Sequence, residues 1–98
     1  MNKFGILENK YWGKVFVEYS PSRNLVWINS SSESIGFNLD EINFDLDYVT
    51  DFLVSKEGRH CWGTYLPKEI LDKIEEKIDK NDEWLVGQLN YFKRILNY

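Results

Sequence analysis

A chain of 98 residues, 43% of them apolar, has the length of one domain and is too apolar to remain disordered. Its formal net charge of −4 argues against nucleic acid and anionic membranes as partners and favours a basic partner. Aromatic residues make up 16% of the sequence, more than a core of this size requires, so we expect some rings at the surface. We expect residues 1–98 to form a single domain.

The cysteine content and the first residues bear on the compartment. Cys61 is the only cysteine and cannot form a disulfide within the chain, which is typical of proteins in a reducing compartment. Residues 1–8 contain too short an apolar run for a signal peptide, and no apolar run approaches the length of a membrane span. We therefore expect a cytoplasmic protein.

Strands are predicted in the N-terminal part. Residues 11–19 and 25–29 are rich in β-branched and aromatic residues, and the five residues between them, Ser-Pro-Ser-Arg-Asn, are turn formers. The pattern predicts a β-hairpin over 11–29. Residues 3–8 and 34–38 are candidates for edge strands.

The two faces of this hairpin differ in composition. Alternation places Phe16 and Glu18 on one face and Val15 and Val17 on the other, whereas residues 25–28 are apolar on both faces. We expect the sheet to be covered on both sides. The alternative is that one face leaves its aromatic side chains exposed.

Two helices are predicted in the C-terminal part, over 67–80 and 83–97. Pro67 suits the start of the first helix, and Asn81 or Asp82 can cap the second. Apolar residues recur at spacings of three and four in both helices: Leu71, Ile74 and Ile78, then Leu85, Leu89, Phe92 and Leu96. We expect an antiparallel helix pair packed against the sheet, which makes the fold class α+β.

Residues 37–49 combine apolar residues with four carboxylates, Asp51 follows closely, and no Lys or Arg occurs between Arg23 and Lys56. As a strand, this segment would alternate apolar and polar residues, but Asp and Asn are poor strand formers. A helix over 39–56 agrees with more signals, because Asn38 can cap it. Its aliphatic residues would also form one stripe: Leu39, Ile42, Leu46, Val49 and Leu53. We therefore predict the helix.

The predicted helix would carry rings and carboxylates on the face away from its aliphatic stripe. Rings provide contact area at low entropic cost, and carboxylates select a cationic partner. The alternative is that another part of the molecule covers the rings and that the acids beside them are solvated. The candidate partner-binding residues are Asp40, Glu41, Phe44, Asp45, Asp47, Tyr48 and Asp51.

The sequence contains no catalytic, metal or cofactor signature. Tyr48 and Val54 stand where a calcium loop beginning at Asn43 needs Gly and Glu. His60 and Cys61 are the only residues of their types, and neighbours in an extended chain point to opposite sides, which does not suit a thiol–imidazole nucleophile. We expect a binding protein and not an enzyme, with no metal and no cofactor.

In size and in its acidic, cation-free segment, the chain resembles the immunity proteins of bacterial polymorphic and contact-dependent toxin systems. The resemblance is one of surface character over about a third of the chain, carried by Asp40, Glu41, Asp45, Asp47 and Asp51. It implies an antitoxin that binds and occludes a basic toxin domain, a nuclease whose phosphate-binding surface is cationic. We expect such a protein to be a monomer or a weak homodimer when free.

Two other functions fit the same composition. A phage-encoded nucleic-acid mimic that inhibits a defence nuclease would be equally acidic but would space its carboxylates as a nucleic acid spaces its phosphates. A small structural subunit or homodimer would instead use the aromatic face of the sheet.

Overall fold

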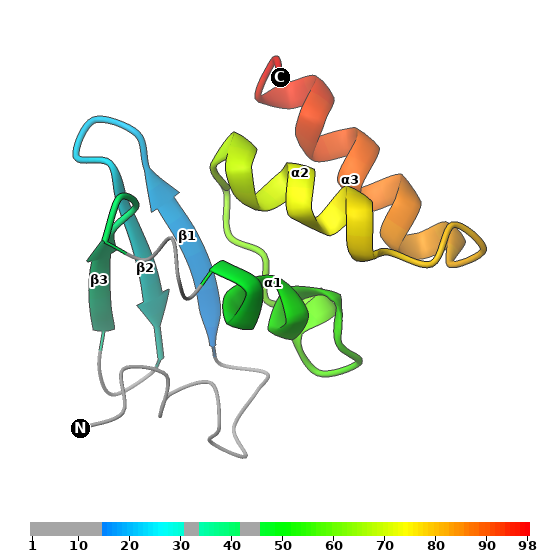
Figure 1. Ribbon diagram of the computed structural model, residues 1–98, viewed down its shortest axis with the longest axis horizontal. Helices are drawn as coiled ribbons and strands as arrows, with labels where there is room; N and C mark the ends of the chain where they lie inside the picture. The colour runs from blue at the N-terminus through cyan, green and yellow to red at the C-terminus, as the bar shows by residue number, and fades with distance from the viewer. Residues whose placement is uncertain (1–14, 31–33, 42–45) are drawn as a thin grey trace.

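The computed structural model describes residues 15–30, 34–41 and 46–98, and the α+β fold predicted from the sequence is confirmed in them (Figure 1). Three strands are followed by the helices: β1 (Phe16–Ser20), β2 (Leu25–Asn29), β3 (Ser34–Asn38), α1 (Leu46–Val54), the short 3-10 helix η2 (Gly58–His60), α2 (Lys68–Lys77) and α3 (Glu83–Ile95). Within these described ranges, none of the helices has both the length and the apolar composition that a membrane span needs.

The strands form an antiparallel sheet in the order β1-β2-β3. The predicted hairpin is confirmed from Phe16 onward, and the predicted edge strand 34–38 is present as β3. Asn24 closes the hairpin turn in a left-handed backbone conformation, with φ of 52°, which Asn tolerates better than most residues. Residues 3–8 and 11–14, where further strand was predicted, lie outside the described residues.

The second edge of β1 is also paired, by the segment 61–65 that leads from η2 towards α2. The backbone N–H of Val17 donates to the carbonyl of Cys61, and the N–H of Gly63 donates to the carbonyl of Val17, both at 2.8 Å. The N–H of Tyr19 donates to the carbonyl of Tyr65, also at 2.8 Å. A Cβ on Gly63 would lie 2.7 Å from the Cβ of Glu18, so the close approach of this segment requires glycine.

The two faces of the sheet have different environments. On one face Val17, Val26 and Ile28 are fully buried, and one cluster of buried side chains joins this face to all three helices. On the other face Phe16 is 46% exposed, and the ring of Trp27 lies over Gly36. The helices α1, α2 and α3 lie to one side of the sheet (Figure 1). The expectation of cover on both faces therefore does not hold at Phe16.

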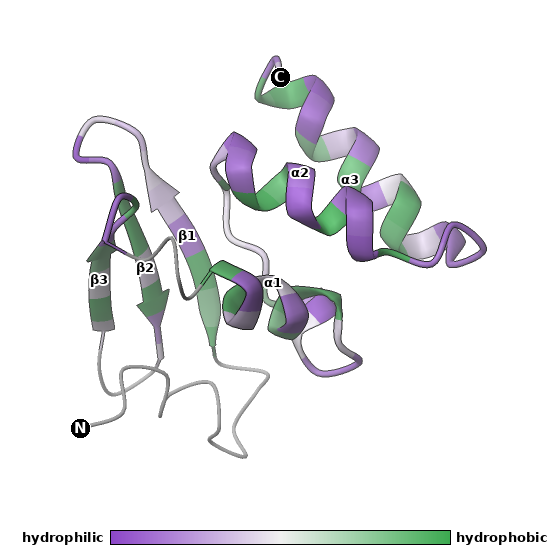
Figure 2. Ribbon diagram, viewed as in Figure 1, coloured by the Kyte–Doolittle hydropathy of each residue, from purple (hydrophilic) through white to green (hydrophobic). Residues whose placement is uncertain are grey.

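The two C-terminal helices form slightly shorter spans than the predicted ones, and both are confirmed. Hydrophobic and hydrophilic residues alternate along α2 and α3 (Figure 2), and the apolar side chains of the predicted stripes are buried or half-buried. Pro67 precedes α2 as its N-cap. Asp82 caps α3, where its Oδ1 accepts a hydrogen bond of 3.2 Å from the backbone N–H of Leu85.

Helix α1 begins later than the helix predicted over 39–56. Asn38 does not cap it; its Oδ1 accepts from the N–H of Asp40 at 3.0 Å, and its carbonyl accepts from Glu41, so the chain turns here. Leu39 is buried at the end of the sheet, where its N–H donates to the carbonyl of Asn24. This local hydrogen bonding competes with helix formation, as is usual for Asn.

Candidate partner-binding surface

The outer face of α1 carries three of the predicted binding residues. Asp47, Tyr48 and Asp51 are exposed, with Tyr48 42% exposed, and Leu53 is fully buried on the opposite face. Phe52, which the helical period places on the flank, is partly buried against the core. Within α1 the predicted separation of an aliphatic face from an acidic and aromatic face is therefore observed.

The remaining candidates do not join these three on α1. Asp40 and Glu41 are exposed in the turn after β3. The charge of Asp40 reaches Tyr19 on β1: burial, then the carboxylates of Glu69 and Asp40, raise the pKa of that hydroxyl. Phe44 and Asp45 were also predicted to bind and lie outside the described residues.

Two lysines of α2 neutralise the carboxylates of α1. The Nζ of Lys77 lies 2.7 Å from the Oδ1 of Asp51 and 3.3 Å from the Oδ1 of Asp47. The Nζ of Lys73 lies 3.2 Å from the same oxygen of Asp47. Hydrogen bonds from Lys73 and Lys77 lower the pKa of Asp47, and the bond to Asp51 is the main cause that raises the pKa of Lys77.

These lysines are the part of the surface that sequence reasoning missed. No Lys or Arg lies close to these acids in the sequence. The two lysines belong to α2 and contact the acids only because α2 packs against α1. The signal that could have revealed them is their spacing: Lys73 and Lys77 are four residues apart, as are Asp47 and Asp51. Two adjacent helices with matching four-residue spacing of opposite charges can pair along their length.

A hollow of about 310 Å³ lies beside the ion pairs and is lined by Tyr48, Asp51, Phe52 and Ser55. Its end is fixed by the loop after α1, where the hydroxyl of Ser55 donates to the carbonyl of Phe52 and accepts from the N–H of Gly58 at 3.0 Å. A Cβ on Gly58 would lie 1.8 Å from the carbonyl oxygen of Phe52, so only glycine fits. We name Asp47, Tyr48, Asp51, Phe52 and Ser55 the α1 surface.

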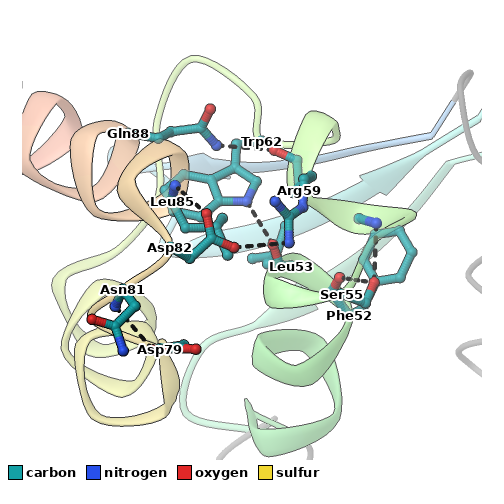
Figure 3. A network of polar contacts seen from close by, with 11 residues as sticks. Phe52, Leu53, Ser55, Arg59, Trp62, Asp79, Asn81, Asp82, Leu85 and Gln88 are labelled. Carbon is teal, nitrogen blue, oxygen red and sulfur yellow. Dashed lines mark hydrogen bonds and ion pairs between the residues drawn. The ribbon is translucent and has the colours of Figure 1, made fainter.

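A second group of polar contacts joins η2 to α3 (Figure 3). A guanidinium nitrogen of Arg59 lies 3.0 Å from a carboxylate oxygen of Asp82, and the side-chain amide of Gln88 donates to the carbonyl of Arg59 at 3.0 Å. The indole N–H of Trp62 donates to the carbonyl of Leu53 at 2.9 Å. These contacts hold α1, η2 and α3 together, which gives them a structural role.

The thiol–imidazole pair considered from the sequence has no catalytic geometry. Cys61 is buried, burial raises the pKa of its thiol, and its Sγ faces the carbonyl of Glu57 at 3.5 Å. The ring of His60 instead contacts the ring of Trp84 edge-on, with centroids 4.8 Å apart. A raised pKa keeps the thiol protonated, and the thiolate is the nucleophilic form. Among the residues that the structure describes, no cluster of His, Cys, Asp and Glu could hold a metal ion.

Comparison with known protein families, with curated protein sequences and with solved structures found no match for this chain.

Proposed function

We propose that the protein is an immunity protein, an antitoxin that binds a basic toxin domain with nuclease activity through the α1 surface and occludes it. The observation that carries the proposal is the hollow of the α1 surface, where the rings of Tyr48 and Phe52 stand beside the carboxylate of Asp51. Rings beside carboxylates suit a partner that inserts a cationic side chain with an apolar stem.

The ion pairs to α2 are compatible with binding of a cation. Every contact that Lys73 and Lys77 make with the two carboxylates uses an Oδ1 atom, and both carboxylates are well exposed. A guanidinium of the partner can therefore approach Asp51 while Lys77 stays in place. Ion pairs between exposed side chains are also weak enough to exchange with competing charges. In the free protein the lysines hold the carboxylates in position, which lowers the entropy lost on binding.

The net charge of −4 adds attraction at long range. A nuclease needs a cationic surface to bind phosphates. Opposite charge on the two proteins accelerates their encounter and makes the association rate fall as salt is added. The acidic turn at Asp40 and Glu41 contributes to this field without belonging to the α1 surface.

The test is a titration against the basic C-terminal domain of a large secreted protein encoded upstream, the partner that an immunity protein would have. Asp51→Lys is expected to weaken binding at least tenfold, about 1.4 kcal/mol, because it reverses the charge beside the hollow. Tyr48→Ala is expected to weaken it similarly by removing a ring. Glu76→Lys is the matched control, since Glu76 is an exposed carboxylate of α2 outside the α1 surface. Equal affinity of Asp51→Lys and the control would reject the site, and no binding by the wild type would reject the function.

A second candidate function is that of a subunit that docks through the outer face of the sheet. A hollow of about 430 Å³ on that face is lined by Phe16, Glu18, Asn29, Trp62, Gly63 and Thr64. The exposed ring of Phe16 favours this candidate. The nucleic-acid mimic is less well supported, because it needs a row of carboxylates at phosphate-like spacing and the α1 surface offers two, Asp47 and Asp51.

A further inference from the structure

Helix α3 has an exposed aromatic and aliphatic stripe in addition to its buried one. Trp84, Tyr91 and Ile95 are 45%, 51% and 48% exposed. Their spacings of seven and four place them within about 40° of one another around the helix, at 100° per residue. The stripe runs almost the whole length of α3, from its first turn to its last.

Gly87 lies beside this stripe, one turn before Tyr91, and makes no close packing contact within its own chain. A Cβ at this position would meet no atom within 4 Å, and the backbone there is not in a conformation that favours glycine. Glycine is among the least favourable residues in the interior of a helix. Its presence on an exposed face permits a ring or a backbone of another molecule to approach closely.

Both rings of the stripe are held by guanidinium groups of their own chain. The Cζ of Arg59 lies 5.8 Å from the ring centroid of Trp84, and the Cζ of Arg94 lies 5.7 Å from that of Tyr91. Arg59 is in turn held by its ion pair with Asp82. Side chains that are ordered before binding lose less entropy when a partner covers them.

We propose that α3 pairs with α3 of a second copy of this chain, antiparallel, about a two-fold axis that crosses the exposed face of the helix at the level of Leu89. In this register the facing residues are complementary in shape and in charge. The midpoint of each pair in the sequence falls within about half a residue of position 89, as one two-fold axis requires. The pairs are Trp84 with Ile95, Gly87 with Tyr91, and Glu83 with Arg94.

The charge pair supports the choice of occupant. Glu83 lies in the first turn of α3 and Arg94 in the last, so an antiparallel partner brings opposite charges together at both ends of the interface. A parallel pair would bring like charges together instead. Antiparallel helix dipoles also attract. The two-fold symmetry repeats each contact, so one exposed stripe supplies both halves of the interface.

The dimer is expected to be weak. One helix face buries less than the roughly 1,200–2,000 Å² of a standard stable interface, and two copies that each carry a charge of −4 repel each other. Sedimentation equilibrium of the full chain from micromolar to millimolar concentration should therefore show a reversible monomer–dimer equilibrium. A monomer at every concentration would overturn the proposal.

Gly87→Gln tests the position of the interface without disturbing the fold. Gln is a good helix former and its side chain meets open space in the monomer, so the melting temperature should not fall. The dissociation constant of the dimer should rise at least tenfold, because the new side chain occupies the space that the Tyr91 ring of the second copy would fill. Phe16→Gln is the control on the sheet face and should leave the dimer intact. The opposite pattern would mean that the sheet forms the dimer and would overturn the proposal.

Charge reversal tests the antiparallel register. Glu83→Arg and Arg94→Glu should each weaken self-association, since each places like charges at both ends of the interface. Mixed together, the two variants should form a heterodimer, because every facing pair is then again of opposite charge. Failure of the mixture to associate more tightly than either variant alone would exclude this register.

Discussion

Gly58 and Gly87 have opposite surroundings, and the sequence alone does not show which of the two positions requires glycine. A Cβ at Gly58 would overlap the backbone carbonyl of Phe52, whereas a Cβ at Gly87 would meet nothing. At Gly58 the loop after α1 returns against the helix end, so the requirement arises from tertiary structure. At Gly87 the helix is regular and exposed, so within a single copy of the chain the residue only lowers helix stability.

The two alanine variants should therefore change stability in opposite directions. Gly58→Ala should reduce the free energy of unfolding by about 3 kcal/mol, because the obstructing atoms belong to the backbone and cannot rotate away. Gly87→Ala should raise it by roughly 0.5–1 kcal/mol through helix propensity. Urea unfolding at a low protein concentration, where the chain is monomeric, measures both. A Gly58→Ala variant as stable as the wild type would contradict the loop geometry.

At the scale of elements, the helices differ in how well the sequence predicts them. The starts of α2 and α3 follow from local chemistry, Pro67 before one and the Asp82 cap of the other. The start of α1 does not, because Leu39 fits the predicted stripe equally well but is buried at the end of the sheet. The periodicity of apolar residues predicts which side chains are buried, but it does not predict which element they pack against.

The same limit applies to the α1 surface. The helical period correctly groups Asp47, Tyr48 and Asp51, since their separation depends only on α1 itself. The pairing of the two acids with Lys73 and Lys77 depends on how α1 packs against α2, which no local pattern contains. Sequence reasoning therefore predicts which side chains point outward together and leaves their final charge environment undetermined.

The cap of α3 gives a prediction at this scale. Asp82 both accepts from the N–H of Leu85 and forms the ion pair with Arg59, whose Nε is buried without a hydrogen-bond partner among the described residues. Asp82→Ala should lower the free energy of unfolding by about 2 kcal/mol through loss of the cap and of the ion pair. Asp82→Asn keeps the cap and loses the charge, so its effect should be clearly smaller. Equal losses in both variants would show that the ion pair, and not the cap, stabilises this end of α3.

At the scale of the whole molecule, the segment 61–65 connects the sheet to the helices. Its backbone bonds to β1 on one side, and the carbonyl of Leu66, just after it, accepts a hydrogen bond of 2.9 Å from the hydroxyl of Tyr98 at the end of the chain. The hydroxyl of Tyr19 on β1 is held by Asn24 at 2.7 Å. The sheet, the connecting segment and the C-terminus thus meet around two tyrosines.

These tyrosines should make the fold sensitive to alkaline pH. Burial is the main cause that raises the pKa of both hydroxyls. For Tyr98, the negative charges of ionised Tyr19 and of Glu69 raise the pKa further. The folded state then keeps protons that the unfolded chain releases near pH 10, so the free energy of unfolding falls as pH rises above about 10. The carboxylate partners of Lys68 and Lys77 raise the pKa values of these lysines, so their deprotonation also lowers the free energy of unfolding at alkaline pH. A variant is therefore needed to isolate the effect of the tyrosines.

Tyr98→Phe separates the two contributions. At neutral pH it should cost about 1 kcal/mol, because the hydrogen bond to Leu66 is lost. As pH rises above about 10, its stability should fall less steeply than that of the wild type, since one of the two hydroxyls with a raised pKa can no longer ionise. Urea unfolding across this pH range measures the difference in slope. Parallel pH profiles for the two proteins would mean that the ionisation of Tyr98 does not contribute to the alkaline loss of stability.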